Sequence, residues 1–146
     1  MDVYVLRGRG DGLETLLLRR APGGRSPGSW EAVHGHIDAD EPPASAAARE
    51  ITEETGLVPS RLYNLSRTEA FYLHRLDVVA IVPVFAAFVA NGEVGLSVEH
   101  DDYAWLPLSE ARRRCSWPRI ARALDDVEEL LGGGDAAALE DVLRVR

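Results

Sequence analysis

Residues 35–57 read GHIDADEPPASAAAREITEETGL, and they contain the clearest helix signal in the chain. Pro42 and Pro43 open a run of helix-forming residues that continues to Thr55, and Gly56 follows directly. Proline at the start and glycine just past the end are the usual boundaries of a helix. The sequence therefore predicts a helix from Pro42 to Thr55.

One face of this helix carries small and apolar side chains. Its members are Ala44, Ala47, Ala48, Ile51 and Thr55. At about 100° per residue they fall within an arc of roughly 100°. A narrow stripe of small side chains predicts close packing of the helix on a sheet.

The other side of the same helix concentrates negative charge. Glu50, Glu53 and Glu54 span roughly 100° of the helix circumference. Carboxylates at this spacing repel one another, and a divalent cation is the natural compensation. For an isolated Glu-x-x-Glu-Glu, a solvated acidic helix face is the commoner alternative.

Alternating apolar residues before the helix predict β-strands. The segments around 3–5 and 16–18 alternate on either side of a glycine-rich turn at 8–12. A loop at 21–29 then leads to a short strand candidate at 30–34. Three short strands are thus expected before the helix begins.

The second half of the chain predicts further strands and then two helices. Residues 62–89 are rich in β-branched and aromatic side chains, and 78–89 are apolar nearly throughout, as in a central strand covered on both faces. Asn91 and Gly92 predict a hairpin turn, and 103–106 a last strand. The helices are expected at 107–115 and 118–131, and the tail at 135–146 has no assignment.

This order of elements indicates an α/β (α+β) fold class, with a mixed sheet sandwiched between helices. A chain of 146 residues is long enough for one hydrophobic core, so residues 1–146 are expected to form a single domain. Its only cysteine, Cys115, excludes an internal disulfide and a cysteine-rich metal site.

Composition narrows the classes of function. All 16 basic residues are arginine, which excludes lysine-dependent chemistry, and 24 acidic residues give a net charge of −8. The acidic balance argues against long nucleic acid as a partner. The sequence has no apolar run that could span a membrane, so we expect a cytoplasmic protein with no membrane partner. An oligomer is compatible with the sequence.

The spacing within residues 35–57 resembles that of the Nudix hydrolases. Their motif is G-x5-E-x7-R-E-U-x-E-E-x-G-U, where U is a bulky aliphatic residue, and every fixed position is filled here. We refer to residues 35–57 as the Nudix box. The resemblance implies a Nudix-type α/β/α sandwich and an enzyme that cleaves a phosphoanhydride bond.

By the same resemblance, Glu50, Glu53 and Glu54 supply ligands to Mg²⁺ or Mn²⁺, hard cations that prefer oxygen ligands. The backbone carbonyl of His34 is a further ligand. The catalytic residues are Glu53, Glu50 and Arg49, with one glutamate able to act as a base. Arg49 lies four residues before Glu53 and can hold its carboxylate.

Family members often take another acidic ligand from a loop outside the box. Glu99 is the candidate here, because it stands just before the last predicted strand. Asp101 and Asp102 compete for the same role, and a merely solvated acidic loop is the remaining alternative.

The branch similar to dihydroneopterin triphosphate pyrophosphatase suggests the substrate-binding residues. In that resemblance Arg19 and His34 lie near the phosphates, Phe71 and Tyr72 near the ring system, and Ser116 at the rim. Arg19 is equally compatible with a strand-edge charge, and Phe71 and Tyr72 with core positions.

The sequence thus predicts a Mg²⁺-dependent or Mn²⁺-dependent pyrophosphohydrolase acting on a small nucleotide or polyphosphate. The expected reaction converts a nucleoside or pterin triphosphate to a monophosphate and pyrophosphate. One alternative is hydrolysis of a nucleoside diphosphate linked to a sugar, a nucleoside or an RNA cap. Another is a nucleotide-binding Nudix module without catalysis, although such modules usually lose box glutamates and this sequence retains them.

Overall fold

A mixed seven-stranded sheet forms the middle layer of the structure, a computed structural model that describes residues 1–146. The strands are β1 (Asp2–Arg7), β2 (Glu14–Arg20), β3 (Trp30–Glu31), β4 (Val33–His34), β5 (Pro59–Leu73), β6 (Val78–Val89) and β7 (His100–Pro107). The helices are α1 (Pro43–Thr55), α2 (Leu108–Arg114), α3 (Pro118–Leu131) and α4 (Glu140–Leu143), with short 3₁₀ turns at Gly10–Gly12 and Ala137–Leu139.

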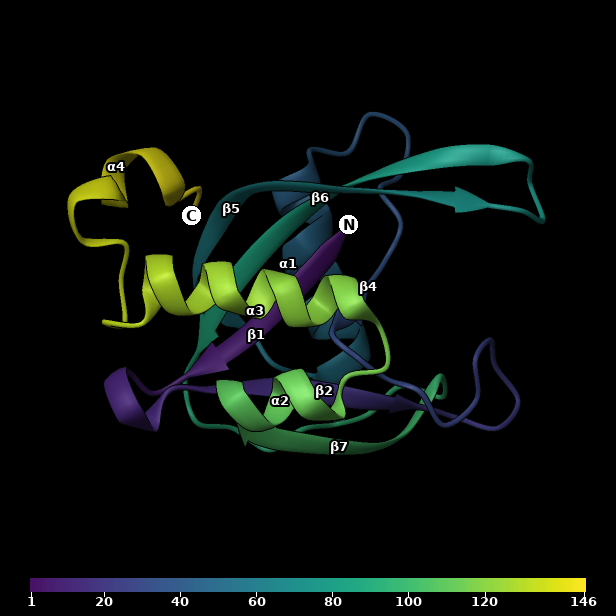
Figure 1. Ribbon diagram of the computed structural model, residues 1–146, viewed down its shortest axis with the longest axis horizontal. Coiled ribbons are helices and arrows are strands. Elements are labelled where there is room, and N and C mark those ends of the chain that lie inside the picture. Colours follow the sequence, from purple (N-terminus) through teal and green to yellow (C-terminus); the bar gives the residue numbers. More distant parts are fainter.

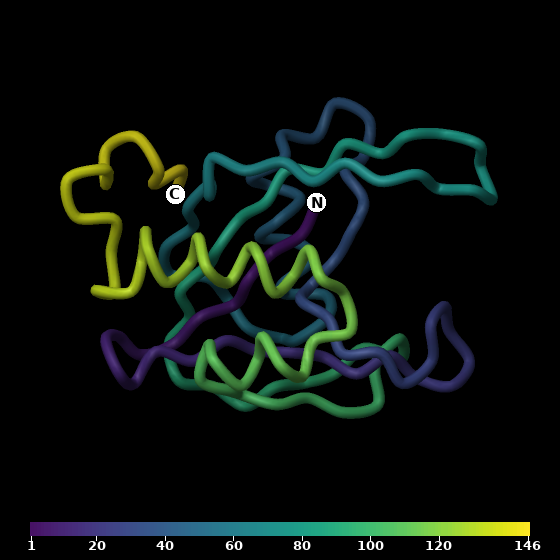
Figure 2. Tube along the Cα trace, in the orientation of Figure 1, coloured from purple at the N-terminus to yellow at the C-terminus, as the bar shows by residue number.

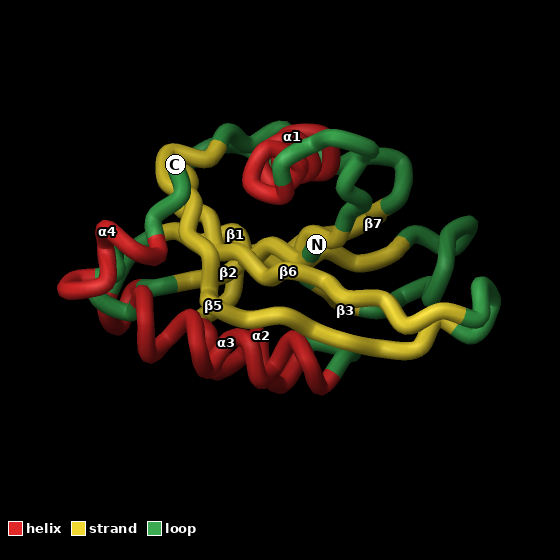
Figure 3. The backbone as a smooth tube through the Cα atoms, turned by 90° about the horizontal axis from the view of Figure 1, so that it is seen from above, coloured by secondary structure: helices red, strands yellow, loops and turns green.

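Helices cover both faces of this sheet. In Figure 1, α2 and α3 cross in front of the strands, and Figure 3 shows α1 on the opposite side of the sheet. The only parallel pair is β1 with β6, and the other pairs are antiparallel. The predicted sandwich of a mixed sheet between helices is confirmed.

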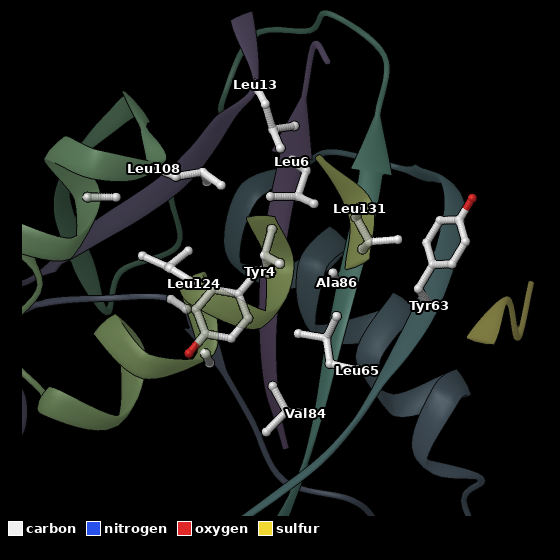
Figure 4. Packing of buried hydrophobic residues seen from close by; sticks show 14 of the residues in the cluster. Tyr4, Leu6, Leu13, Tyr63, Leu65, Val84, Ala86, Leu108, Leu124 and Leu131 are labelled. Atoms are coloured by element: carbon white, nitrogen blue, oxygen red, sulfur yellow. The ribbon is translucent and has the colours of Figure 1, made fainter. Parts of the chain in front are cut away.

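Strand β1 contributes to two hydrophobic clusters because its side chains alternate between the faces. Val3 and Val5 pack in the cluster on the α1 side, and Tyr4 and Leu6 in the cluster that includes α2 and α3. Figure 4 shows Tyr4 close to Leu124 of α3. A strand buried on both faces therefore anchors all three layers.

The sheet divides where β1 and β2 separate. These strands pair only near Leu6↔Thr15, and beyond that point β3 pairs with β2 while β4 pairs with β1. The single strand expected at 30–34 is therefore two strands separated by Ala32, because this segment bridges two diverging neighbours. The second of them places His34 opposite Asp2.

Helix α1 confirms the predicted boundaries, with Pro43 in its first turn and Gly56 in the left-handed region at φ 70°. Ala46 and Ala47 are fully buried, so the helix lies close to the sheet. The expected buried face is displaced slightly, because Ala46 is fully buried and Ala44 only partly. Glu54 also lies on the buried side, with 6% of its surface exposed.

The β5–β6 hairpin corrects the expectation of a strand covered along its whole length. Residues 84–89 are buried. The preceding part, however, projects from the body of the molecule (Figures 1 and 2), and Ile81 is 73% exposed. The reason is that β1 begins at Asp2, opposite Val84, so no strand accompanies the earlier part of β6 on that side.

The hairpin predicted at Asn91 and Gly92 is wrong, because β7 pairs with β2 and not with β6. The connecting segment instead crosses the end of α1, where Gly95 N donates to Thr55 O at 2.9 Å and Ser97 N to Glu54 O at 3.2 Å. Carbonyls at a helix end need partners of this kind. The loop that carries Glu99 is thereby attached to α1.

Helices α2 and α3 confirm the two predicted C-terminal helices. The unassigned tail contains α4 and returns to β5, where Val145 N donates to Leu62 O at 2.8 Å. Among the helices of the structure, none has the length and hydrophobicity needed to span a lipid bilayer.

Candidate active site

The turn at Gly35 and the side chain of Glu50 depend on each other. A Cβ at Gly35 would overlap the Glu50 side chain, so only glycine allows this approach. Gly35 N also donates to Met1 O at 3.1 Å, which attaches the turn to the start of β1. The glycine of the motif therefore seats the Glu50 carboxylate against the backbone that follows β4.

Arg49 is the centre of an ion-pair network on α1. Its Nε and Nη2 donate to the two carboxylate oxygens of Glu41 at 3.0 and 2.9 Å. Its Nη1 donates to Glu50 Oε1 at 2.9 Å and to Glu53 Oε2 at 3.1 Å, and Nη2 also donates to His36 O at 3.0 Å. These contacts, led by the Glu41 hydrogen bonds, raise the pKa of Arg49. We call Arg49, Glu41, Glu50 and Glu53 the Arg49 network.

Glu54 has a different environment from its neighbour in the sequence. Its carboxylate is buried, and Oε2 has no hydrogen-bond partner. Burial, together with the charges of Glu50 and Glu99, raises the pKa of Glu54 to about 8. The protein thus holds an unsatisfied carboxyl group among other acidic side chains.

Glu99 reaches this region from the loop before β7, where it meets an arginine. Arg20 Nη1 lies 2.7 Å from Glu99 Oε2, and Arg20 Nε lies 3.2 Å from Glu31 Oε1. Asp101 and Asp102 pair instead with Arg19, at 2.7 and 3.6 Å. Asp101 and Asp102 belong to β7, and Glu99, in the loop before it, is the one of the three acidic candidates whose charge acts on Glu54.

The donor set suits a divalent cation. No three His, Cys, Asp or Glu side chains converge in a metal-ligand arrangement in this structure, in which Glu50 and Glu53 face Arg49 and Glu99 faces Arg20. The unpartnered oxygen of Glu54 is nevertheless the kind of group that a hard cation satisfies.

A second polar cluster lies where β1 and β4 meet. His34 Nδ1 lies 2.5 Å from Asp2 Oδ1, and Arg119 Nε lies 3.2 Å from Asp2 Oδ2. Although burial opposes the shift, the hydrogen bond with His34 and the charge of Arg119 lower the pKa of Asp2. Asp2 is therefore a buried carboxylate held from both sides.

A cleft of about 260 Å³ opens beside this cluster. One wall consists of the turn at His34 and Gly35, and the other of the hairpin, including Phe71 and Leu73. It lies where β6 extends beyond the start of β1. The cleft brings the turn that seats Glu50 and the ring of Phe71 to one hollow.

The predicted substrate residues have different surroundings. Phe71 and His34 line the cleft. Tyr72 does not line the cleft, because the residue is 60% exposed and its hydroxyl donates to Asp77 at 2.8 Å. Consecutive residues of a strand point to opposite faces, which separates it from Phe71. Ser116 Oγ accepts a hydrogen bond from Trp30 N at 3.0 Å, which joins the α2–α3 loop to β3.

The sequence motifs did not single out several residues of these clusters. Asp2, Glu31 and Arg20 are polar residues in or beside apolar strands, and this mismatch is the signal that could have found them. Trp117 Nε1 donates to Glu31 Oε2 at 3.2 Å. Arg119 stands in an amphipathic helix with one other arginine, Arg122, and only the folded chain distinguishes the two.

Sequence comparison places these features in a known family. The NUDIX domain model matches residues 1–127. The octanoyltransferase of Myxococcus xanthus is 38% identical over 118 residues, which cover 78% of this chain and 32% of that protein. The chain therefore spans about a third of that relative. The mouse bis(5'-nucleosyl)-tetraphosphatase (asymmetrical) is 31% identical over 122 residues, covering 82% of this chain and 81% of that protein.

Solved structures share the same fold. A Caenorhabditis elegans Ap4A hydrolase, in a binary complex, has a TM-score of 0.71 at 24% identity and covers 90% of this chain and 97% of its own. The Escherichia coli dihydroneopterin triphosphate pyrophosphohydrolase has a TM-score of 0.66 at 21% identity, with coverages of 85% and 91%. At these identities the likeness shows the architecture.

Proposed function

This chain belongs to the Nudix hydrolase family, and we propose that it is a metal-dependent pyrophosphohydrolase of nucleoside or pterin triphosphates. It would cleave a P–O–P bond and release a monophosphate and pyrophosphate. The observation that carries the proposal is the buried, unpartnered carboxyl group of Glu54 beside Glu50 and Glu99. The family motif supplies the reaction type, and this carboxylate supports a cation at the same place.

The residues that would hold Mg²⁺ or Mn²⁺ are Glu50, Glu53, Glu54, Glu99 and the backbone carbonyl of His34. When bound, the cation neutralises polyphosphate charge and lowers the pKa of water. Glu50 or Glu53, besides serving as a proposed ligand, would accept the proton of the attacking water. Which of the two does so is decided by comparing their variants.

Arg49 would act by positioning. The Arg49 guanidinium donates its hydrogen bonds to Glu41, Glu50 and Glu53, which are carboxylates of the protein itself. A rigid fork of this kind restricts the orientation of each carboxylate. The network thus prepares ligands and base without contacting the substrate.

For the substrate, we propose Phe71 as a contact of the ring, with His34 and Arg19 nearer the phosphates. Phe71 and His34 lie on opposite walls of one cleft. Arg19 is held by Asp101 at 2.7 Å, so a phosphate would compete with that carboxylate. Tyr72 and Ser116 have less direct roles, since Tyr72 faces away from the cleft and Ser116 orients Trp30.

A second candidate substrate is a dinucleoside tetraphosphate. It is favoured by the 31% identity to the mouse asymmetrical bis(5'-nucleosyl)-tetraphosphatase, over 81% of that protein. Both candidates require the same carboxylates, and they differ in the group at the far end of the phosphate chain.

Hydrolysis in ¹⁸O-labelled water, followed by phosphorus NMR, tests the proposal. The panel contains GTP, ATP, 7,8-dihydroneopterin triphosphate and diadenosine tetraphosphate. Labelled monophosphate or pyrophosphate from a triphosphate identifies the attacked phosphorus and supports the first candidate. Preferential release of ATP and AMP from the tetraphosphate supports the second. Binding without hydrolysis of any compound would indicate a nucleotide-binding module and contradict both.

Removal of metal is the second test. Excess EDTA should abolish turnover, and millimolar Mg²⁺ or Mn²⁺ should restore it, because the cation offsets the charge of the polyphosphate. The control is the same EDTA concentration already saturated with Mg²⁺. Full activity in excess EDTA would contradict the metal assignment of the glutamates.

A further inference from the structure

We infer that Arg119 selects the ring of the substrate, and that it favours a ring with a carbonyl oxygen beside an unprotonated ring nitrogen. Guanine has this pair at O6 and N7, and a 4-oxopteridine has it at O4 and N5. Adenine presents an amino donor beside N7 and cannot accept two hydrogen bonds there. The inference rests on the proposed function, since it concerns the ring that the polyphosphate carries.

One edge of the Arg119 guanidinium is already fixed. Its Nε lies 3.2 Å from Asp2 Oδ2, and the other oxygen of that buried carboxylate lies 2.5 Å from His34 Nδ1. The charge of Arg119 is therefore compensated inside the protein. Asp2 and His34 leave the guanidinium little freedom to turn.

Two aromatic rings fix the position of the same group. The Arg119 Cζ atom lies 5.0 Å from the ring centroid of Phe71 and 5.6 Å from that of Trp117. Trp117 is itself held by its hydrogen bond to Glu31. An arginine immobilised in this way loses little rotational freedom when a ligand binds.

The opposite edge of the guanidinium is free. Neither Nη1 nor Nη2 has a hydrogen-bond partner in the protein, and neither is sealed from solvent. The Arg119 side chain as a whole is 18% exposed. A planar pair of N–H donors with its other edge anchored is suited to two adjacent acceptors in one plane.

The place of Arg119 favours a ring over a phosphate. It contacts Phe71, a residue of the cleft wall, and reaches His34 on the other wall through Asp2. Under the proposed function the polyphosphate would lie beside Glu50 and Glu54, whereas Arg119 contacts Asp2, Phe71 and Trp117. Aromatic faces next to Arg119 favour stacking of a planar base.

Comparison of GTP with ATP tests this selection, because the two differ only in the ring. We expect the kcat/KM of the wild type to favour GTP by about 5–100-fold, the discrimination of one bidentate pair. Arg119→Lys retains the charge beside Asp2 but lacks the planar pair, so it should lower kcat/KM for GTP to the ATP value, mainly through KM. Arg119→Gln should do the same. Arg122→Gln, on the exposed side of the same helix, is the matched control and should retain the preference.

Calorimetry with the α,β-methylene analogues of GTP and ATP gives a readout independent of turnover. Tighter binding of the GTP analogue by the wild type and equal binding by Arg119→Lys would support the inference. Equal binding by the wild type, or a preference that persists in a folded Arg119→Lys, would overturn it. If neither triphosphate is hydrolysed but the analogue preference follows Arg119, the proposed function fails and the inference stands. The kcat/KM ratio of dihydroneopterin triphosphate to GTP distinguishes the two ring sources.

Discussion

The glutamates of α1 have opposite environments. In the Arg49 network, Glu50 and Glu53 each lie within about 3 Å of a guanidinium nitrogen, as does Glu41. One residue further along, Glu54 is buried and has an unpartnered oxygen. The fold pairs Glu50 and Glu53 with Arg49 and leaves one oxygen of Glu54 without a partner.

This difference separates a self-satisfied ion-pair network from an unsatisfied carboxyl group. A paired carboxylate is oriented by the protein alone, whereas a buried carboxylate without a partner costs stability until something binds it. Under the proposed function, Glu54 is therefore the glutamate that would gain most from a cation.

The largest effect is expected on the pH dependence of stability in metal-free protein. The pKa of Glu54 is raised from 4.5 to about 8. Its stabilising contribution is therefore complete below pH 4.5, where folded and unfolded chains are both protonated, and is lost as the pH rises through 8. In urea unfolding with EDTA present, the stability of Glu54→Gln relative to the wild type should rise between pH 4.5 and 8. The expected change in the ratio of the two unfolding equilibrium constants is on the order of 10³. Parallel stability curves for the two proteins would contradict the raised pKa.

Turnover should respond next most strongly to the same carboxylate. Glu54→Gln and Glu53→Gln are each expected to lower kcat by at least about 10²-fold, because each would remove a metal ligand or a positioned base. Glu93→Gln, an exposed acid outside the site, is the control for loss of one charge. Steady-state rates at saturating Mg²⁺ measure the effect, and near-normal rates in both variants would rule out the assignment.

The acidic residues around the start of β7 should give a smaller change. Glu99→Gln is expected to raise the Mg²⁺ concentration needed for half-maximal activity and to cut turnover by about 10–100-fold. Asp101→Asn and Asp102→Asn should leave the Mg²⁺ requirement unchanged, because these acids face Arg19. A Mg²⁺ titration of each variant makes the comparison. A damaging Asp102→Asn with a silent Glu99→Gln would move the role to Asp102.

A change in the Arg49 network should give the smallest effect. Arg49→Lys keeps a positive charge but cannot contact both Glu41 oxygens and the two box carboxylates together. We expect kcat to fall by about 10-fold with KM nearly unchanged, since ligand orientation is lost and substrate contacts remain. A pure rise in KM would instead mean that Arg49 contacts the substrate.

Much of this site follows from local sequence. Pro42, Pro43 and Gly56 bound α1, and the spacing from Arg49 to Glu53 alone predicts the ion pair that the structure contains. Helix boundaries and i,i+4 contacts depend on residues within a few positions of one another. The resemblance to the Nudix motif, which lies entirely within residues 35–57, has the same local character.

Other features required distant parts of the chain. Asn91 and Gly92 have the composition of a hairpin turn, yet the segment after them hydrogen-bonds to the end of α1. Residues 78–81 have the composition of a covered strand, yet they are largely exposed because β1 begins opposite Val84. In both cases the pairing of strands overrides the local pattern.

The sequence by itself determined the helix, its acidic side, the alternating strands around it and the family to which the chain belongs. Only the tertiary structure decided that Glu54 is buried while Glu53 is exposed, that Glu99 meets Arg20, and that Arg119 is fixed beside Phe71. Propensity and spacing act between near neighbours, whereas burial and charge pairing depend on which distant residues the sheet brings together.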